Sequence, residues 1–148
     1  MASVKEIIAH RVAQELEDGY VVNLGIGLPT LVANYVPEGI DISLQSENGI
    51  IGMGGAMDLV VGAKKVIIAM THTNKGAVKI FNKISLPATA LKCVDMIVTE
   101  MGVIEVTPEG LELKELAPGV SVEDIQAVTE PKLIVKGTPK TMVMPPEA

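Results

Sequence analysis

Residues 40–49 read Ile40-Asp41-Ile42-Ser43-Leu44-Gln45-Ser46-Glu47-Asn48-Gly49, an alternating apolar run that leads into a tight Asn-Gly turn. The alternation predicts a strand, and Asn-Gly favours the positive φ values of a turn. A carboxylate held at such a strand end, where water is scarce and a substrate can reach it, has the setting of a nucleophile. Taken alone, the tetrapeptide fits a plain turn with a solvated Glu47 better, so the neighbouring segments have to decide.

The segments before this turn alternate between helix and strand signals. Ser3 with Glu6 forms a capping-box pattern, and apolar residues recur at helical spacing up to Gly19. A short apolar strand follows over residues 20–24, then a glycine loop, a helix from Pro29 to about Val36, and the strand described above. This order of strand, helix and strand predicts a parallel sheet.

The second half of the chain opens with a second glycine-rich loop, residues 52–58. Residues 66–70 form an apolar run without alternation, which predicts a central strand covered on both faces. Further strands are expected at residues 96–99 and 103–106, an antiparallel hairpin partner at 111–116, a short helix from Ser121 to about Val128, and a last strand at 133–135. The predicted fold is α/β, an open and mostly parallel sheet flanked by helices, with a C-terminal antiparallel hairpin.

Length and composition indicate one domain with an aliphatic core. The 148 residues are 48% hydrophobic but only 2% aromatic. We expect the domain to span residues 1–136 and the proline-containing residues 137–148 to form a flexible tail. The net charge of −6 disfavours a nucleic acid or an anionic membrane as partner. A single cysteine, Cys93, the absence of a signal-peptide pattern and the lack of a membrane-length apolar run favour the cytoplasm.

The usual cofactor and catalytic motifs do not fit. Gly25-x-Gly27 follows a strand, but Thr30 stands where a dinucleotide fingerprint needs Gly or Ala. Glycines there still let backbone amides approach a ligand, and the helix beyond favours an anion. His10 and His72 lack metal-ligand spacing, so both are expected to be surface or structural residues and no metal is expected. Asn23 in the preceding strand is a polar residue that needs a partner.

Several ordered segments together resemble the B (beta) subunit of the family I CoA-transferases, of the acetate/acetoacetate and 3-oxoacid type. The resemblance runs from the opening helix to about Val135 and is carried by residues 22–30, Gln45-Ser46-Glu47-Asn48-Gly49, Gly52-Met53-Gly54-Gly55-Ala56-Met57-Asp58-Leu59, residues 64–70 and residues 98–106. It implies transfer of CoA between a short-chain acyl-CoA and a free carboxylic acid.

The resemblance also implies roles for individual residues and a partner. Glu47 would be the nucleophile that carries CoA as a glutamyl thioester, while Asn23, Gly25, Gly27, Gly54, Gly55 and Ala56 would form the substrate and oxyanion site. Coenzyme A would act as a substrate, with no permanently bound cofactor. A separately encoded A subunit would complete the active site in a hetero-oligomer of two A and two B subunits.

The chain departs from the family at residues 50–55. Family members have a long central segment between the Glu signature and Gly-Met-Gly-Gly-Ala-Met-Asp, but here Glu47 and Gly55 are only eight positions apart. Many relatives have Gly-Met-Gly twice, and this chain has one copy, Gly52-Met53-Gly54. This pattern predicts an internal deletion between the two copies. Two functions therefore stay open: an active CoA-transferase subunit, or an inactive remnant with an interaction or structural role.

Overall fold

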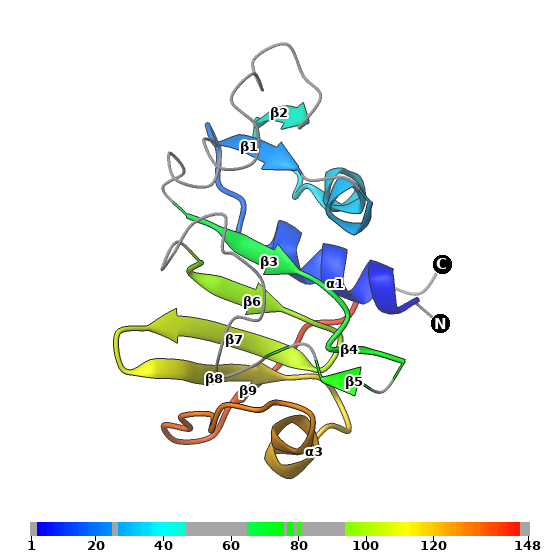
Figure 1. Ribbon diagram of the computed structural model, residues 1–148. Coiled ribbons are helices and arrows are strands. Elements are labelled where there is room, and N and C mark those ends of the chain that lie inside the picture. The colour runs from blue at the N-terminus through cyan, green and yellow to red at the C-terminus, as the bar shows by residue number, and fades with distance from the viewer. Residues whose placement is uncertain are drawn as a thin grey trace.

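A computed structural model describes residues 3–24, 27–46, 65–75, 77–78, 80 and 94–145 (Figure 1). The elements in chain order are α1 (Val4–Ala13), β1 (Val21–Leu24), the 3-10 helix η1 (Leu28–Tyr35), β2 (Ser43–Ser46), β3 (Ile67–Ala69), β4 (Thr73–Asn74), β5 (Ala77–Val78), β6 (Met96–Val98), β7 (Gly102–Thr107), β8 (Gly110–Leu116), α3 (Val122–Ala127) and β9 (Lys140–Thr141). The predicted α/β fold is confirmed.

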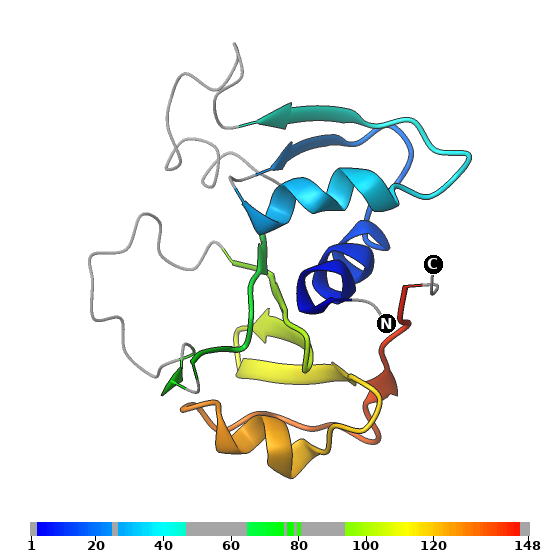
Figure 2. The same ribbon diagram turned by 90° about the vertical axis from the view of Figure 1, so that its right-hand side faces the viewer.

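The largest sheet has the strand order β3-β6-β7-β8-β9 and holds a core on each face. Side chains alternate across a strand, so Val98 and Val103 enter one core with α1, whereas Ile97 and Ile104 enter the other with Ile125 of α3. The first core continues past α1 to η1, as the stacking of these two helices in Figure 2 shows. Helix α1 therefore packs between the main sheet and the β1–η1–β2 segment.

Strands β1 and β2 pair with each other in parallel, with Val21 opposite Ser43 and Leu24 opposite Ser46. Strands β3 and β6 are also parallel, and their arrows point to the same side as those of β1 and β2 in Figure 1. The carboxyl ends of these four strands thus face one side of the molecule, as the strand–helix–strand order requires.

The prediction of a central strand at residues 66–70 is wrong. Within the described residues, β3 is the end strand of its sheet, and Ile68 has 36% of its surface exposed. Ile67 and Ala69 pack toward the α1 core, whereas the core under α3 is centred on β6, β7 and β8 and does not bury Ile68. An unbroken apolar run does not reveal which of its side chains the other described elements cover.

Local signals locate the other elements well. The expected capping box of Ser3 with Glu6 is present on α1, and a second one, Ser121 with Asp124, begins α3 at the expected residue. Strands β7 and β8 form the expected antiparallel hairpin. Helix α1 ends at Ala13, earlier than Gly19, and the expected helix from Pro29 is a 3-10 helix. These confirmed elements are those whose hydrogen bonds join residues near in sequence.

The C-terminal segment differs from expectation. The strand expected at residues 133–135 is a single bridge between Ile134 and Glu112. The residues expected to form a loose tail instead include β9, which pairs in parallel with β8, and Met142, which is buried in the α1 core. Residues 137–145 thus pack against the domain, because one strand pair and one apolar side chain fix them there despite the prolines.

Candidate functional site

The carboxyl ends of β1 and β2 lie side by side. The parallel register places Leu24 opposite Ser46, the last residue of each strand. The next residues in sequence are Gly25 and Glu47. Ligands of parallel α/β sheets gather at the carboxyl ends of strands, so this paired end is the candidate functional site.

The glycine loop leads directly into helix η1. Gly27 has a φ of 86° and a ψ of −128°, values open to glycine and strained for other residues. Its carbonyl oxygen accepts two hydrogen bonds from Thr30, one from the amide at 3.0 Å and one from the hydroxyl at 2.6 Å. Pro29 occupies the first turn, where its missing amide proton costs nothing. The helix therefore begins at the carboxyl end of β1, where its N-terminus favours an anion.

The structure describes only part of the predicted site. Asn23 lies in β1 opposite Gln45, so its backbone is placed, although its side chain lies outside the described part. Gly27 is described, as above. Glu47, Gly25, Gly54, Gly55 and Ala56 lie outside the described residues, as does Cys93. The roles suggested for these residues stay predictions.

A buried polar cluster lies at the carboxyl ends of β3 and β6. The ring of His72 is fully buried, with Nδ1 2.9 Å from Oγ1 of Thr99 and Nε2 2.8 Å from Oγ1 of Thr129. The backbone amide of His72 donates to Oε1 of Glu100 at 2.6 Å. The structural role expected for His72 fits this burial. Its hydroxyl partners were not predicted, because they lie 27 and 57 residues away in sequence.

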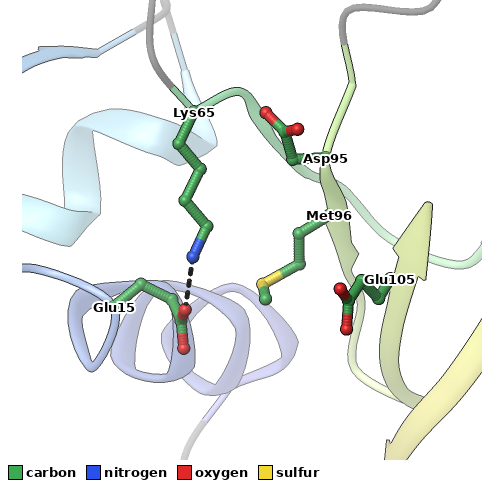
Figure 3. A pocket seen from close by; sticks show the side chains of 5 residues that line it. All are labelled: Glu15, Lys65, Asp95, Met96 and Glu105. Carbon is green, nitrogen blue, oxygen red and sulfur yellow. Dashed lines mark hydrogen bonds and ion pairs between the residues drawn. The ribbon is translucent and has the colours of Figure 1, made fainter. Parts of the chain in front are cut away.

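A hollow of 470 Å³ opens at the other end of β3 and β6, where these strands begin. It is lined by Glu15, Lys65, Asp95, Met96 and Glu105 (Figure 3). Lys65 donates to Glu15 at 2.7 Å, and Oδ2 of Asp95 accepts the amide proton of Val66 at 2.8 Å. The hollow faces away from the carboxyl ends and its polar groups take part in structural contacts, so we do not assign it as the substrate site.

Next to this hollow, Arg11 joins α1 to the main sheet. Its guanidinium donates to both carboxylate oxygens of Glu115 on β8, at 2.9 and 2.6 Å, and to Glu15 at 2.8 Å. The hydrogen bond with Glu115 is the main cause that raises the pKa of Arg11. Burial acts to raise the pKa of Glu15, but the hydrogen bonds from Lys65 and Arg11 outweigh it and hold that pKa below its ordinary value.

A metal site and a membrane-spanning helix each have requirements that can be compared with the described part of the chain. No group of three His, Cys, Asp or Glu side chains there is arranged to hold a metal ion. No helix among these residues has the length and apolar character needed to cross a bilayer.

Solved structures of CoA-transferases are among those that share this fold. An acyl-CoA transferase of Escherichia coli O157:H7, solved as a thioester complex with CoA, matches with a TM-score of 0.78 and 18% identity, over 97% of this chain and 44% of its own. This chain thus spans less than half the length of that transferase. Glutaconate coenzyme A-transferase of Acidaminococcus fermentans matches with a TM-score of 0.74 and 16% identity, over 98% of this chain and 90% of its own. At these identities the likeness shows the fold alone.

Curated relatives of this chain are more similar to it in sequence than these two structures are. The beta subunit of acetate CoA-transferase from Haemophilus influenzae is 38% identical over 213 aligned positions, which cover 95% of this chain and 96% of the relative. The B subunit of 3-oxoadipate CoA-transferase from Acinetobacter baylyi is 32% identical, over 88% of this chain and 94% of the relative. Because this chain has 148 residues, at least 65 of the 213 positions have no counterpart in it.

The missing positions are internal. The profile of the coenzyme A transferase family matches residues 5–54 and again residues 50–127, so the two matches overlap at 50–54. The single Gly52-Met53-Gly54 lies in this overlap, as expected if one copy remains of two. The predicted deletion is thereby supported at the predicted place. With most of its length matched by this profile, the chain belongs to the coenzyme A transferase family, with beta (B) subunits among its relatives and an internal segment missing.

Proposed function

We propose that this chain transfers CoA between a short-chain acyl-CoA and a free carboxylic acid, with Glu47 as the nucleophile. The observation that carries the proposal is the parallel register of β1 and β2, which ends both strands together at Leu24 and Ser46. Gly25 and Glu47 follow these ends in sequence. A carboxylate next to a glycine loop and a helix N-terminus suits a reaction in which anions form and collapse.

The proposed reaction has two halves. The Glu47 carboxylate attacks the carbonyl carbon of the donor thioester and expels CoA as its thiolate, which leaves an acyl-glutamyl anhydride. The thiolate then attacks the Glu47 carbonyl carbon of this anhydride, which releases the donor acid and forms the glutamyl-CoA thioester. The acceptor carboxylate reverses both steps, so Glu47 is regenerated and no electrons are gained or lost.

Each attack produces a tetrahedral oxyanion that needs hydrogen-bond donors. The proposed donors are the backbone amides of Gly54, Gly55 and Ala56, with Asn23 as a further one, while Gly25 and Gly27 let the backbone approach the substrate. Loss of one such donor typically raises the barrier by about 3 kcal/mol. Binding of the remote part of CoA would help to hold the carboxylate against the carbonyl.

The proposed partner is an A-type subunit, in an assembly of two A and two B subunits. The relatives support this partner, since they are named as beta or B subunits of CoA-transferases. The relatives also act on different acids by name, acetate and 3-oxoadipate. The acid used here is therefore left at the level of short carboxylic acids. We expect a cytoplasmic protein.

The internal deletion favours a second function, that of an inactive subunit which only associates. At least 65 family positions are missing, and side chains such as Val21, Ile68 and Val143 are exposed on the described surface. Exposed apolar side chains promote association. This function predicts complex formation without chemistry, whereas a compact monomer at micromolar concentration in light scattering would contradict it.

Labelling of Glu47 distinguishes the two functions. The chain is mixed with an A-type subunit and acetoacetyl-CoA, treated with borohydride and digested for peptide mass spectrometry. Transfer predicts CoA or its reduction product on Glu47, and loss of this label in Glu47→Gln, which is nearly isosteric but a poor nucleophile. Glu38→Gln, on an exposed turn residue, is the matched control and keeps the label. A label on another residue would overturn the mechanism, and no label at all would establish the inactive subunit.

A further inference from the structure

His72 is a buried titratable residue with no part in the proposed reaction. It follows β3 and lies between the turn that joins β6 to β7 and the end of α3. Both ring nitrogens are hydrogen-bonded to hydroxyl groups, Nδ1 to Thr99 and Nε2 to Thr129. Three segments far apart in sequence therefore meet at one imidazole.

The surrounding hydrogen bonds favour one position for the ring proton. The Thr129 hydroxyl lies 2.7 Å from the carbonyl oxygen of Ile125. When it donates its proton there, it can only accept from His72, which favours a hydrogen on Nε2. Oγ1 of Thr99 accepts the amide protons of Met101 at 3.1 Å and Gly102 at 3.3 Å. Its own proton is then available to Nδ1 of His72 at 2.9 Å.

We propose that the neutral Nε2–H form of His72 is an acid-sensitive latch, which fastens the end of β3 to the β6–β7 turn and to the end of α3. A second proton on Nδ1 would point at Oγ1 of Thr99, which already accepts two amide protons. The Thr99 hydroxyl would then have to turn to the carbonyl oxygen of Gly102, at 3.5 Å, where a hydrogen bond is weak. Burial also penalises the charged ring.

Among the described residues, the carboxylate of Glu100 brings a negative charge next to His72, and this charge favours a protonated ring. Burial and the hydroxyl partners of the ring oppose it. Oε1 of Glu100 is engaged by the backbone amide of His72 at 2.6 Å, whereas both ring nitrogens are bonded to hydroxyls. The remaining charged groups of these elements within the described residues are exposed: Lys75 after β4, Glu123 and Asp124 in the first turn of α3, and Glu130 after Thr129. Their attraction or repulsion is screened by water.

The latch acts on the side of the sheet that carries the candidate site. The carboxyl ends of β1, β2, β3 and β6 share that side in Figure 1. Thr129 follows α3, and Ile125 of α3 is fully buried in the core beneath it. Protonation of His72 would therefore loosen both the carboxyl end of β3 and helix α3, which packs over this core.

The first test reads the tautomer directly. The full chain has two histidines, so His10→Gln leaves His72 as the only one. In this variant, long-range proton–nitrogen NMR should show a hydrogen on Nε2, a bare Nδ1 and no protonation between pH 8 and 6. A hydrogen on Nδ1, or a charged ring at pH 7, would overturn the proposal.

The second test measures stability against pH. An unfolded histidine has a pKa near 6.5, so a ring that stays neutral in the fold lowers the folded-to-unfolded ratio about 25-fold between pH 7 and 5. This loss should be present in the wild type and in His10→Gln and absent from His72→Gln. An equal pH dependence in all three, within about twofold, would refute the latch. Should His72→Gln not fold, the tautomer measurement decides alone, and neither readout depends on transfer activity.

Discussion

Replacing Arg11 tests how strongly its ion pair with Glu115 holds helix α1 to the main sheet. Arg11→Met removes the guanidinium that joins α1 to Glu115 on β8 and to Glu15. The Arg11 side chain is 8% exposed and that of Glu115 is 16% exposed, so the variant leaves a mostly buried carboxylate without its counter-charge. We expect a strongly destabilised but folded protein.

The magnitude follows from this burial. Removing one partner of a buried ion pair costs about 3–5 kcal/mol, and the partial exposure of Glu115 favours the lower end, about 3 kcal/mol. Removing both charges is different, because apolar residues of similar volume often replace such a pair without net loss. Arg11→Met combined with Glu115→Leu should therefore recover to within about 1 kcal/mol of the wild type.

Urea unfolding at pH 7, followed by circular dichroism because the chain has no tryptophan, measures this. With a slope of about 2 kcal/mol per M, Arg11→Met should lower the midpoint by roughly 1.5 M. Lys136→Met, which breaks the exposed pair with Glu109, is the control and should leave the midpoint unchanged. A shift below about 0.5 M for Arg11→Met, or a double variant as unstable as the single one, would refute the reasoning.

Three further variants test single features of the fold. Gly102→Ala should destabilise the folded protein by about 1–3 kcal/mol, because a Cβ there would overlap the carbonyl oxygen of Glu115 and crowd Ile125. An unchanged midpoint of thermal unfolding would contradict this close packing. Ser3→Ala should cost about 1 kcal/mol and expose the first amides of α1 to hydrogen exchange, and unchanged exchange would show that the cap is dispensable. The pKa of Glu15 is lower in the folded than in the unfolded state, so as pH falls the unfolded state takes up this proton first. The stabilisation by the ionised Glu15 is therefore complete above the unfolded pKa, near 4.5, and is lost as pH falls through the lower folded pKa. Glu15→Gln should flatten the acid limb of the curve of stability against pH, and a curve parallel to that of the wild type would contradict this.

Sequence was sufficient where the deciding interactions are local. The capping box of α1, the start of α3 at Ser121 and the β7–β8 hairpin rest on contacts between residues a few positions apart, and all three were predicted. The glycine loop before η1 was also predicted, because Gly27 and Pro29 have few other conformations available.

Where distant partners decide, sequence was not sufficient. The apolar run at 66–70 does not say which strand lies beside it, and β3 proved to be an end strand among the described residues. The prolines after Gly137 suggest a loose tail, but Met142 finds a place in the α1 core. No local sequence feature identifies Thr99 or Thr129 as partners of His72, because only the tertiary fold brings these distant residues together.

The deletion bears differently on folding and on the proposed catalysis. The first family match contains α1, β1, η1 and β2, and the second contains β3 to β8 and α3. Helix α1 packs both on η1 and on the main sheet, so both matches share one core that does not require the missing positions. The proposed catalysis makes a different demand, because its nucleophile Glu47 comes from the first match and its oxyanion-site residues Gly55 and Ala56 from the second. A stable fold with an unlabelled Glu47 would therefore locate the loss in the approach of these two loops.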